Sequence, residues 1–187
     1  MSAETLVAQY EKYCNVLKKV LNEEAVNLLT ETVGERLVTS PRGLTLADGG
    51  SPGGLVEFSL SVASRAKEMS PNFGDTKSLV RVSLLHELGK LGDLEAGHEL
   101  FIPQESQWHQ EKLGQMYKYN EDCPKMNVAH RTLWILAHLN IEITREEWMA
   151  INVSQGLHLQ ENQFYASSID NIAAGLLSAR MSVLFGA

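Results

Sequence analysis

Apolar side chains recur along most of this chain at the spacing of one helix face. Between residues 6 and 21 they fall three or four positions apart, which is typical of an amphipathic helix. The same spacing predicts helices over residues 55–70, 75–88, 127–139 and 168–184. Because these helices share apolar faces of one kind, we expect them to pack around a common core.

Capping residues mark two further helices. Asn22 precedes two glutamates and is expected to cap a short helix that Gly34 ends. Thr144 and Glu147 have the spacing of a capping box and predict a helix that runs through Ile151. Nothing in the pattern alternates strands with helices, so the expected fold class is all-α, a bundle of about seven or more helices.

The helical pattern is interrupted over residues 39–54. Proline, glycine, serine and aspartate dominate there and predict a long loop. Loops of this length inside a compact domain are often functional. A loop whose glycines only allow the chain to turn explains the composition equally well.

Composition and charge exclude several classes of protein. The chain has 187 residues, of which 44% are hydrophobic and 21% charged, which indicates a folded domain of ordinary size. A formal charge of −7, with the basic residues dispersed, disfavours a duplex nucleic acid partner. No apolar run has the length of a membrane span and no signal peptide is visible, so we expect a cytoplasmic protein with no membrane partner. Cys14 and Cys123 are expected to be reduced thiols.

One segment joins an imidazole to a carboxylate at the end of an apolar helix. It reads Leu84-Leu85-His86-Glu87-Leu88-Gly89-Lys90. Imidazole nitrogen and carboxylate oxygen together suit several divalent metals. The segment resembles the HD-domain metal-dependent phosphohydrolases, in which Leu-Leu-His-Asp is followed by Ile or Leu, then Gly-Lys.

The resemblance covers residues 34–184. It implies a single domain over 1–187, with N-terminal helices over 1–33, an HD-like core over 34–187 and a lid-like insertion at about 92–124. The segments that carry it are a Thr-Ser-Pro loop at 39–41, a Gly-Gly-Leu stretch at 53–60, an insertion at 107–120 similar to that of phage and bacterial nucleotide hydrolases, and motif-like stretches at 128–133 and 150–156.

The family's metal ligands are mostly substituted. The positions that the resemblance assigns to the other ligands hold Phe58, Val128, Ser154 and Ala179. Hydrolytic metal sites need about three protein ligands and an open position for water. We therefore expect no cofactor and no hydrolase activity. His86 and Glu87 are better explained as a hydrogen-bonded core residue and a carboxylate paired with a nearby Lys or Arg than as a weak, empty metal pair.

The resemblance implies a degenerate HD-fold protein. We expect it to bind a nucleotide or phosphorylated small molecule without cleaving it, or to act as a protein-interaction module. Lys90 and Arg131 keep family-like positions and are candidates to hold a phosphate, although a solvated charge at a helix end explains each as well. A phage or prophage source fits the resemblance, with the host cytoplasm or the virion as location.

The alternative function is an active metal-dependent nucleotide phosphohydrolase. It would need a divalent ion (Mn, Fe, Co, Ni, Zn or Mg) held by His86 and Glu87. Recruited ligands such as Glu57, Asp93 or His109 would have to complete the site.

Overall fold

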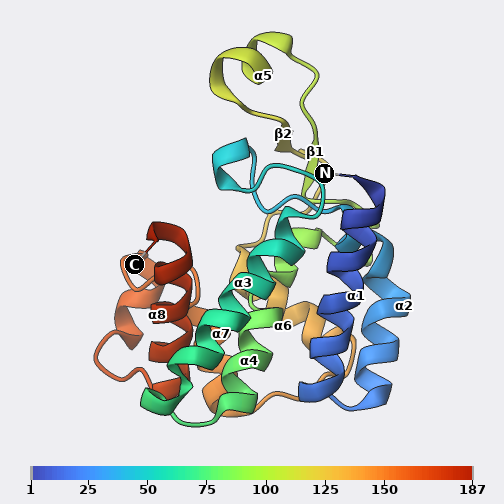
Figure 1. Ribbon diagram of the computed structural model, residues 1–187. Coiled ribbons are helices and arrows are strands. Elements are labelled where there is room, and N and C mark those ends of the chain that lie inside the picture. The colour runs from blue at the N-terminus through green and yellow to red at the C-terminus, as the bar shows by residue number, and fades with distance from the viewer. Residues whose placement is uncertain (1, 187) are drawn as a thin grey trace.

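The computed structural model describes residues 2–186, most of which are helical (Figure 1). This confirms the expected all-α class, with only one small two-stranded sheet in the described residues. No helix in that part of the chain is both long and apolar enough to span a bilayer. The α-helices are α1 (Ala3–Val20), α2 (Glu23–Thr39), α3 (Gly54–Met69), α4 (Thr76–Leu85), α5 (Gln107–Leu113), α6 (Val128–His138), α7 (Arg145–Val153) and α8 (Asn171–Phe185).

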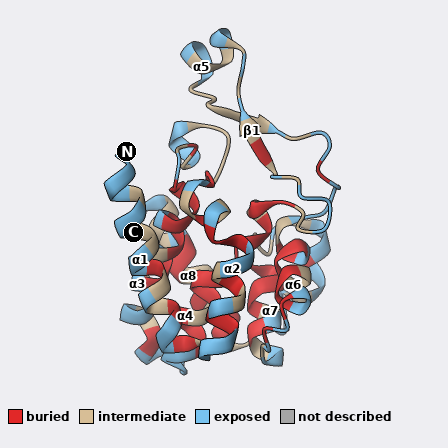
Figure 2. Cartoon of the chain, turned by 90° about the vertical axis from the view of Figure 1, so that its right-hand side faces the viewer, coloured by how far each residue is buried: buried red, intermediate tan, exposed pale blue. Residues whose placement is uncertain are grey.

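Helices α3 and α4 form the centre of the bundle. Helix α3 packs against α4 and α8, and α4 also contacts α1 and α7. The buried residues lie on the inner parts of the bundle and the exposed residues on its outside (Figure 2). Phe58, Leu84, Leu85 and Leu176 are buried, as their spacing predicts. Leu177, which we also expected in the core, is only partly buried, because the next residue on a helix points about 100° away.

Helix α2 is longer than the sequence predicts. Gly34 does not end it, since the helix continues through Thr39. A Cβ atom at Gly34 would lie 2.7 Å from the hydroxyl oxygen of Tyr10, so the glycine permits close contact between α1 and α2. The expected division between residues 33 and 34 therefore falls inside this helix.

A hairpin projects from one end of the bundle and carries α5 at its tip (Figure 1). Its strands are β1 (Phe101–Pro103) and β2 (Tyr117–Tyr119), which pair antiparallel. The N–H groups of Met116 and Tyr117 donate to the carbonyl oxygen of Leu44 at 2.8 and 3.1 Å. These bonds join the base of the hairpin to the loop that follows α2.

Candidate functional site

The His86-Glu87 pair lies where α4 ends. His86 is the C-cap, and its N–H donates to the carbonyl of Val82 at 2.9 Å. The chain then turns into a short 3-10 helix, η3 (Leu88–Leu91). Gly89 lets η3 lie against α6, because a Cβ there would collide with the carbonyl oxygen of Val128. Both side chains of the pair are consequently enclosed, each with 0% of the residue exposed.

Three cationic side chains surround the carboxylate of Glu87. Arg42 Nε lies 3.2 Å from Glu87 Oε2, and Lys90 Nζ lies 3.0 Å from the same oxygen. Arg180 Nη2 lies 3.0 Å from Glu87 Oε1. Each of the three cationic side chains is 11% exposed. We call these four residues the Glu87 cluster; they come from the loop after α2, from the turn and η3, and from α8.

The Glu87 cluster is positively charged at neutral pH. Burial would raise the pKa of Glu87, but Lys90, Arg42 and Arg180 together lower it to about 2, so the carboxyl is ionised. Burial, reinforced by the neighbouring arginines, lowers the pKa of Lys90 to about 8 although Glu87 opposes the shift. Three positive charges therefore face one negative charge, and the sum is +2.

The aromatic ring of Phe58 supports the two arginines. The guanidinium carbon of Arg42 lies 3.8 Å from the ring centroid, and that of Arg180 lies 5.9 Å from it. A cation near the face of an aromatic ring is attracted by the ring quadrupole. Phe58 occupies the position at which the resemblance expects a histidine ligand, so this position now favours guanidinium groups over a metal ion.

His86 is a neutral, hydrogen-bonded core residue. Its Nδ1 lies 2.9 Å from the carbonyl oxygen of Ser83, and because a carbonyl only accepts, Nδ1 carries the proton. Burial lowers its pKa to about 4. Nε2 has no hydrogen-bond partner within the described residues. His86 therefore has a hydrogen bond within the core and Glu87 has cationic partners, which is the arrangement that the structural interpretation of this pair expects.

A cavity of about 600 Å³ opens beside the Glu87 cluster. Arg42, Lys90 and Arg180 lie in its wall, together with the carboxylate-bearing Asp48. A cavity of this size matches those that bind small molecules. The rest of the wall comes from the loop after α2, the insertion, the N-terminus of α6 and the segment after α7, and includes Thr45, Phe101, Tyr119, Asn127, Val128 and Gln155.

One donor in this wall is left without a partner. Arg180 is 9% exposed, and its Nε is buried with no hydrogen bond in the described residues. A buried donor without a partner costs about 1–3 kcal/mol. An anion in the cavity would offset the surplus charge of the Glu87 cluster, so the wall is suited to hold an anionic group.

The cluster does not fit a divalent metal ion. Both carboxylate oxygens of Glu87 already contact cations, and these cations would repel a metal. The described residues contain no group of three His, Cys, Asp or Glu side chains arranged to hold an ion. His86 offers one free nitrogen, which is too few donors for a hydrolytic site.

The side chains proposed as recruited ligands do not complete the site. His109 hydrogen-bonds Ser106 at 2.8 Å, on the projecting insertion. The carboxylate of Asp93 accepts from the N–H of Ala96 at 2.7 Å, and Glu57 is exposed on α3. None of the three proposed ligands lines the cavity.

Of the two residues that the sequence suggested as phosphate ligands, Lys90 lines the cavity and Arg131 does not. Lys90 lines it and is paired with Glu87, so it is not a solvated helix-end charge. Arg131 is 1% exposed and donates to the carbonyl oxygens of Gly89 (3.2 Å) and Pro124, which ties α6 to η3 and the insertion. We therefore assign Arg131 a structural role.

Sequence reasoning missed Arg42 and Arg180. A signal for Arg180 was present, since it is the one charged residue in the otherwise neutral segment 171–185. A charged side chain in an otherwise apolar helix is either exposed to water or buried with a partner, because burying an unpaired charge costs much free energy. Arg42 lies in the glycine-rich loop and carried no comparable signal.

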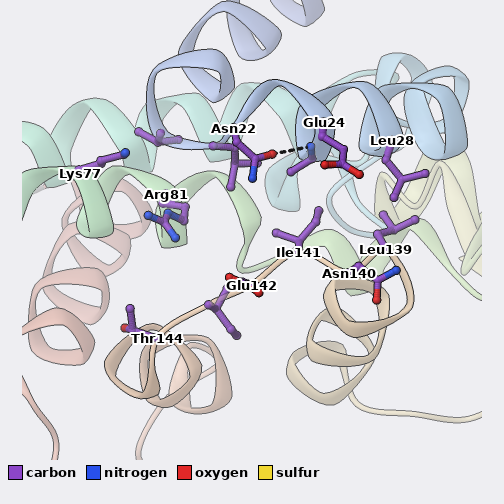
Figure 3. Close-up of a pocket in the computed structure, with 14 residues that line it drawn as sticks. Asn22, Glu24, Leu28, Lys77, Arg81, Leu139, Asn140, Ile141, Glu142 and Thr144 are labelled. Carbon is purple, nitrogen blue, oxygen red and sulfur yellow. Dashed lines mark hydrogen bonds between the residues drawn. The ribbon is translucent and has the colours of Figure 1, made fainter.

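A second cavity, of about 590 Å³, lies between the start of α2 and the segment 139–144 (Figure 3). Its wall mixes Glu24 and Glu142 with Lys77 and Arg81. Arg81 is already paired, since its Nη1 lies 3.1 Å from the buried Glu147. The cavity beside the Glu87 cluster is therefore the better candidate for an anionic ligand.

Comparison of the chain with protein-family models, with curated sequences and with solved structures gives no match in any of the three.

Proposed function

We propose that this protein binds a phosphorylated small molecule, such as a nucleotide, in the cavity beside the Glu87 cluster, and does not hydrolyse it. The observation that carries the proposal is the surplus of positive charge that Arg42, Lys90 and Arg180 bring to the cavity wall. The resemblance to HD-domain proteins adds support, because His86, Glu87 and Lys90 belong to the motif that carries it.

A phosphate group suits this wall in both charge and geometry. A phosphate monoester carries about −1.5 to −2 charges at pH 7, opposite in sign to the +2 of the Glu87 cluster. Guanidinium groups bind phosphate oxygens through parallel N–H donors, while lysine acts as a point charge. Asp48 at the wall disfavours a ligand with many negative charges near it.

Neither Glu87 nor His86 is placed to act as a general base for hydrolysis. A general base must have a free lone pair within reach of the attacking water. Glu87 is ionised but engaged through both oxygens, and His86 is not among the residues that line the cavity. The cationic side chains would stabilise bound phosphate without activating water.

The test is thermal unfolding of the purified protein with phosphate, pyrophosphate, nucleoside monophosphates and triphosphates, and sugar phosphates. A ligand at 100 times its dissociation constant adds about 2.7 kcal/mol of stability, which raises the melting temperature. Arg180→Lys keeps the charge but removes the planar set of guanidinium donors, so it should weaken the binding measured by calorimetry. Arg145→Lys, on an exposed side chain of α7, is the matched control.

Three outcomes separate the alternatives. Stabilisation by a phosphorylated ligand that Arg180→Lys weakens supports the proposal. Release of phosphate in the presence of Mn, Mg, Co or Ni would instead establish the metal-dependent hydrolase. If no compound of the panel binds, the proposal is wrong and a protein-interaction role becomes the better account of the fold.

A further inference from the structure

We propose that a groove beside the N-terminal half of α4 binds an acidic amphipathic helix of a partner protein. The groove has a volume of about 480 Å³ and lies between α1, α3 and α4, which are neighbours in Figure 1. Its wall uses the start of α4, whereas the Glu87 cluster follows the end of that helix. The inference is therefore independent of the function proposed above. We call it the lysine groove; it is lined by Lys12, Val16, Lys19, Val20, Leu60, Ala63, Ser64, Lys67, Thr76, Lys77 and Val80.

The floor of the lysine groove is apolar. Val20, Ala63 and Val80 are buried there with 5%, 5% and 8% of each residue exposed. Val16 and Leu60 are partly exposed beside them. Apolar surface that stays accessible in a concave site gains free energy when an apolar side chain covers it. The floor therefore suits the apolar stripe of a helix.

The rim of the lysine groove carries four positive charges and no negative one. Lys12 and Lys19 of α1, Lys67 of α3 and Lys77 of α4 are all exposed. None of them forms an ion pair within the described residues. The rim is thus a positively charged surface on a chain whose formal charge is −7. At physiological salt, charges act over about 8 Å, so an approaching ligand meets the lysines rather than the net charge.

The spacing of the rim lysines matches the repeat of a helix. Lys12 and Lys19 are seven residues apart on α1, which places them about 10 Å apart along its axis. Glutamates seven residues apart on a docked helix have the same separation. A helix laid along the groove would bury its apolar stripe on the floor and pair its flanking acids with the rim, which is the helix-in-groove mode of recognition.

A second copy of this chain is a poorer occupant. Its exposed acidic helix, α2, presents Glu24 and Glu31 with the correct spacing, but only the partly buried Leu28 lies between them. That face offers too little apolar surface to cover the floor. A partner helix with a continuous apolar stripe satisfies both the floor and the rim.

The probe is a fluorescent synthetic peptide of about 18 residues, with a leucine stripe flanked by glutamates at seven-residue spacing. Binding to the full protein is followed by fluorescence anisotropy. We expect saturable binding that weakens with added salt. A scrambled peptide of the same composition, and one with lysine in place of each glutamate, should not bind.

Charge-reversal variants test the site. Lys12→Glu with Lys19→Glu should weaken peptide binding about tenfold, through two lost exposed ion pairs and new repulsion. The matched control is Lys112→Glu with Lys125→Glu, an exposed lysine of the insertion and one that directly follows it, which should leave binding unchanged. All four positions are exposed, so neither double variant should unfold the protein.

Several results would overturn the proposal. Equal binding of the scrambled peptide, or no effect of the Lys12/Lys19 reversal, would show that the groove does not recognise an acidic helix. Saturable binding of oleate at the groove without binding of the peptide would assign it to a small amphiphile. Self-association that the reversal abolishes, without peptide binding, would assign it to a second copy.

Discussion

Glu87 is the residue on which the cationic wall depends. Removing one member of a buried ion pair leaves the others uncompensated and costs about 3–5 kcal/mol. We therefore expect Glu87→Gln to destabilise the protein by about that amount at pH 7, because three enclosed cations would then face one another. Urea unfolding measures this loss. Glu105→Gln, which removes an exposed pair with Lys118, should cost less than about 1 kcal/mol. If Glu87→Gln also costs less than about 1 kcal/mol, the carboxylate does not hold the three cations together as we infer.

The lowered pKa of Glu87 makes stability depend on acid. Its pKa is about 2 in the folded protein against an ordinary value of 4.5. A carboxyl group whose pKa is lower in the folded than in the unfolded protein stabilises the fold at pH values above its unfolded-state pKa. This stabilisation is lost as the pH falls from about 4.5 to about 2. At about 1.4 kcal/mol for each pH unit the loss is roughly 3 kcal/mol. Glu87→Gln should lack this component of the acid transition.

Lys90 gives the proposed phosphate binding a pH dependence. Its pKa is lowered to about 8, so above that pH the amine of the free protein loses its charge and the Glu87 cluster falls from +2 to +1. The affinity for phosphate should therefore fall as the pH rises through about 8, by about tenfold for one lost charged hydrogen bond. Calorimetric titrations from pH 7 to about 10 test this. Lys90→Arg stays charged throughout, so its affinity should be flat; a fall there too would assign the effect elsewhere.

At the residue scale, the sequence singled out the central pair but not the residues that surround it. His86 and Glu87 were identified because they follow one another at a helix end, and adjacency is visible in sequence. Arg42 and Arg180 reach Glu87 from 45 and 93 residues away, and such pairing depends on tertiary packing that local pattern does not encode. Phe58, where the resemblance expects a histidine ligand, led us to expect weak metal binding but did not reveal the arginines near its ring.

At the element scale, prediction succeeded where several turns repeat a pattern and failed where an element is short. The capping box of Thr144 and Glu147 is present, with both reciprocal hydrogen bonds formed. The strands of the hairpin have three residues each, too few for an alternating pattern to show. Gly34 was misread as a helix end because glycine marks C-termini and close helix contacts alike.

Helix α4 positions the candidate site, so its packing should be sensitive to side-chain volume. Leu85, its last residue, is 0% exposed. Leu85→Ala should destabilise the protein by about 2–5 kcal/mol, from lost burial and the cavity left behind. The control is Leu113→Ala on α5, at a residue that is 51% exposed. Denaturant unfolding of both variants checks this, and a loss under about 0.5 kcal/mol for Leu85→Ala would show that the core assignment is wrong.

At the scale of the whole molecule, the bundle and the insertion differ in how they are held. The bundle encloses a continuous core, whereas the insertion projects from it on two three-residue strands (Figure 2). Few buried contacts imply a low free energy of local opening. Hydrogen exchange should therefore be faster over residues 92–124 than in α4 and α6. Uniform protection from residue 75 to 140 would contradict this expectation.

The metal content of the whole protein distinguishes a protein that only binds a phosphorylated ligand from a metal-dependent hydrolase. A transition metal at the Glu87 carboxylate would have to displace cations that hold both oxygens. At an effective dielectric constant near 20, two unit charges about 4 Å apart repel by about 4 kcal/mol, so every cation that stays beside the carboxylate would weaken metal binding. We expect well under one equivalent of metal by elemental analysis, and no change in melting temperature on adding Mn or Ni. A stoichiometric metal lost in His86→Ala would overturn this, because that result requires the cations to move aside and would restore the hydrolase as the better explanation of the site.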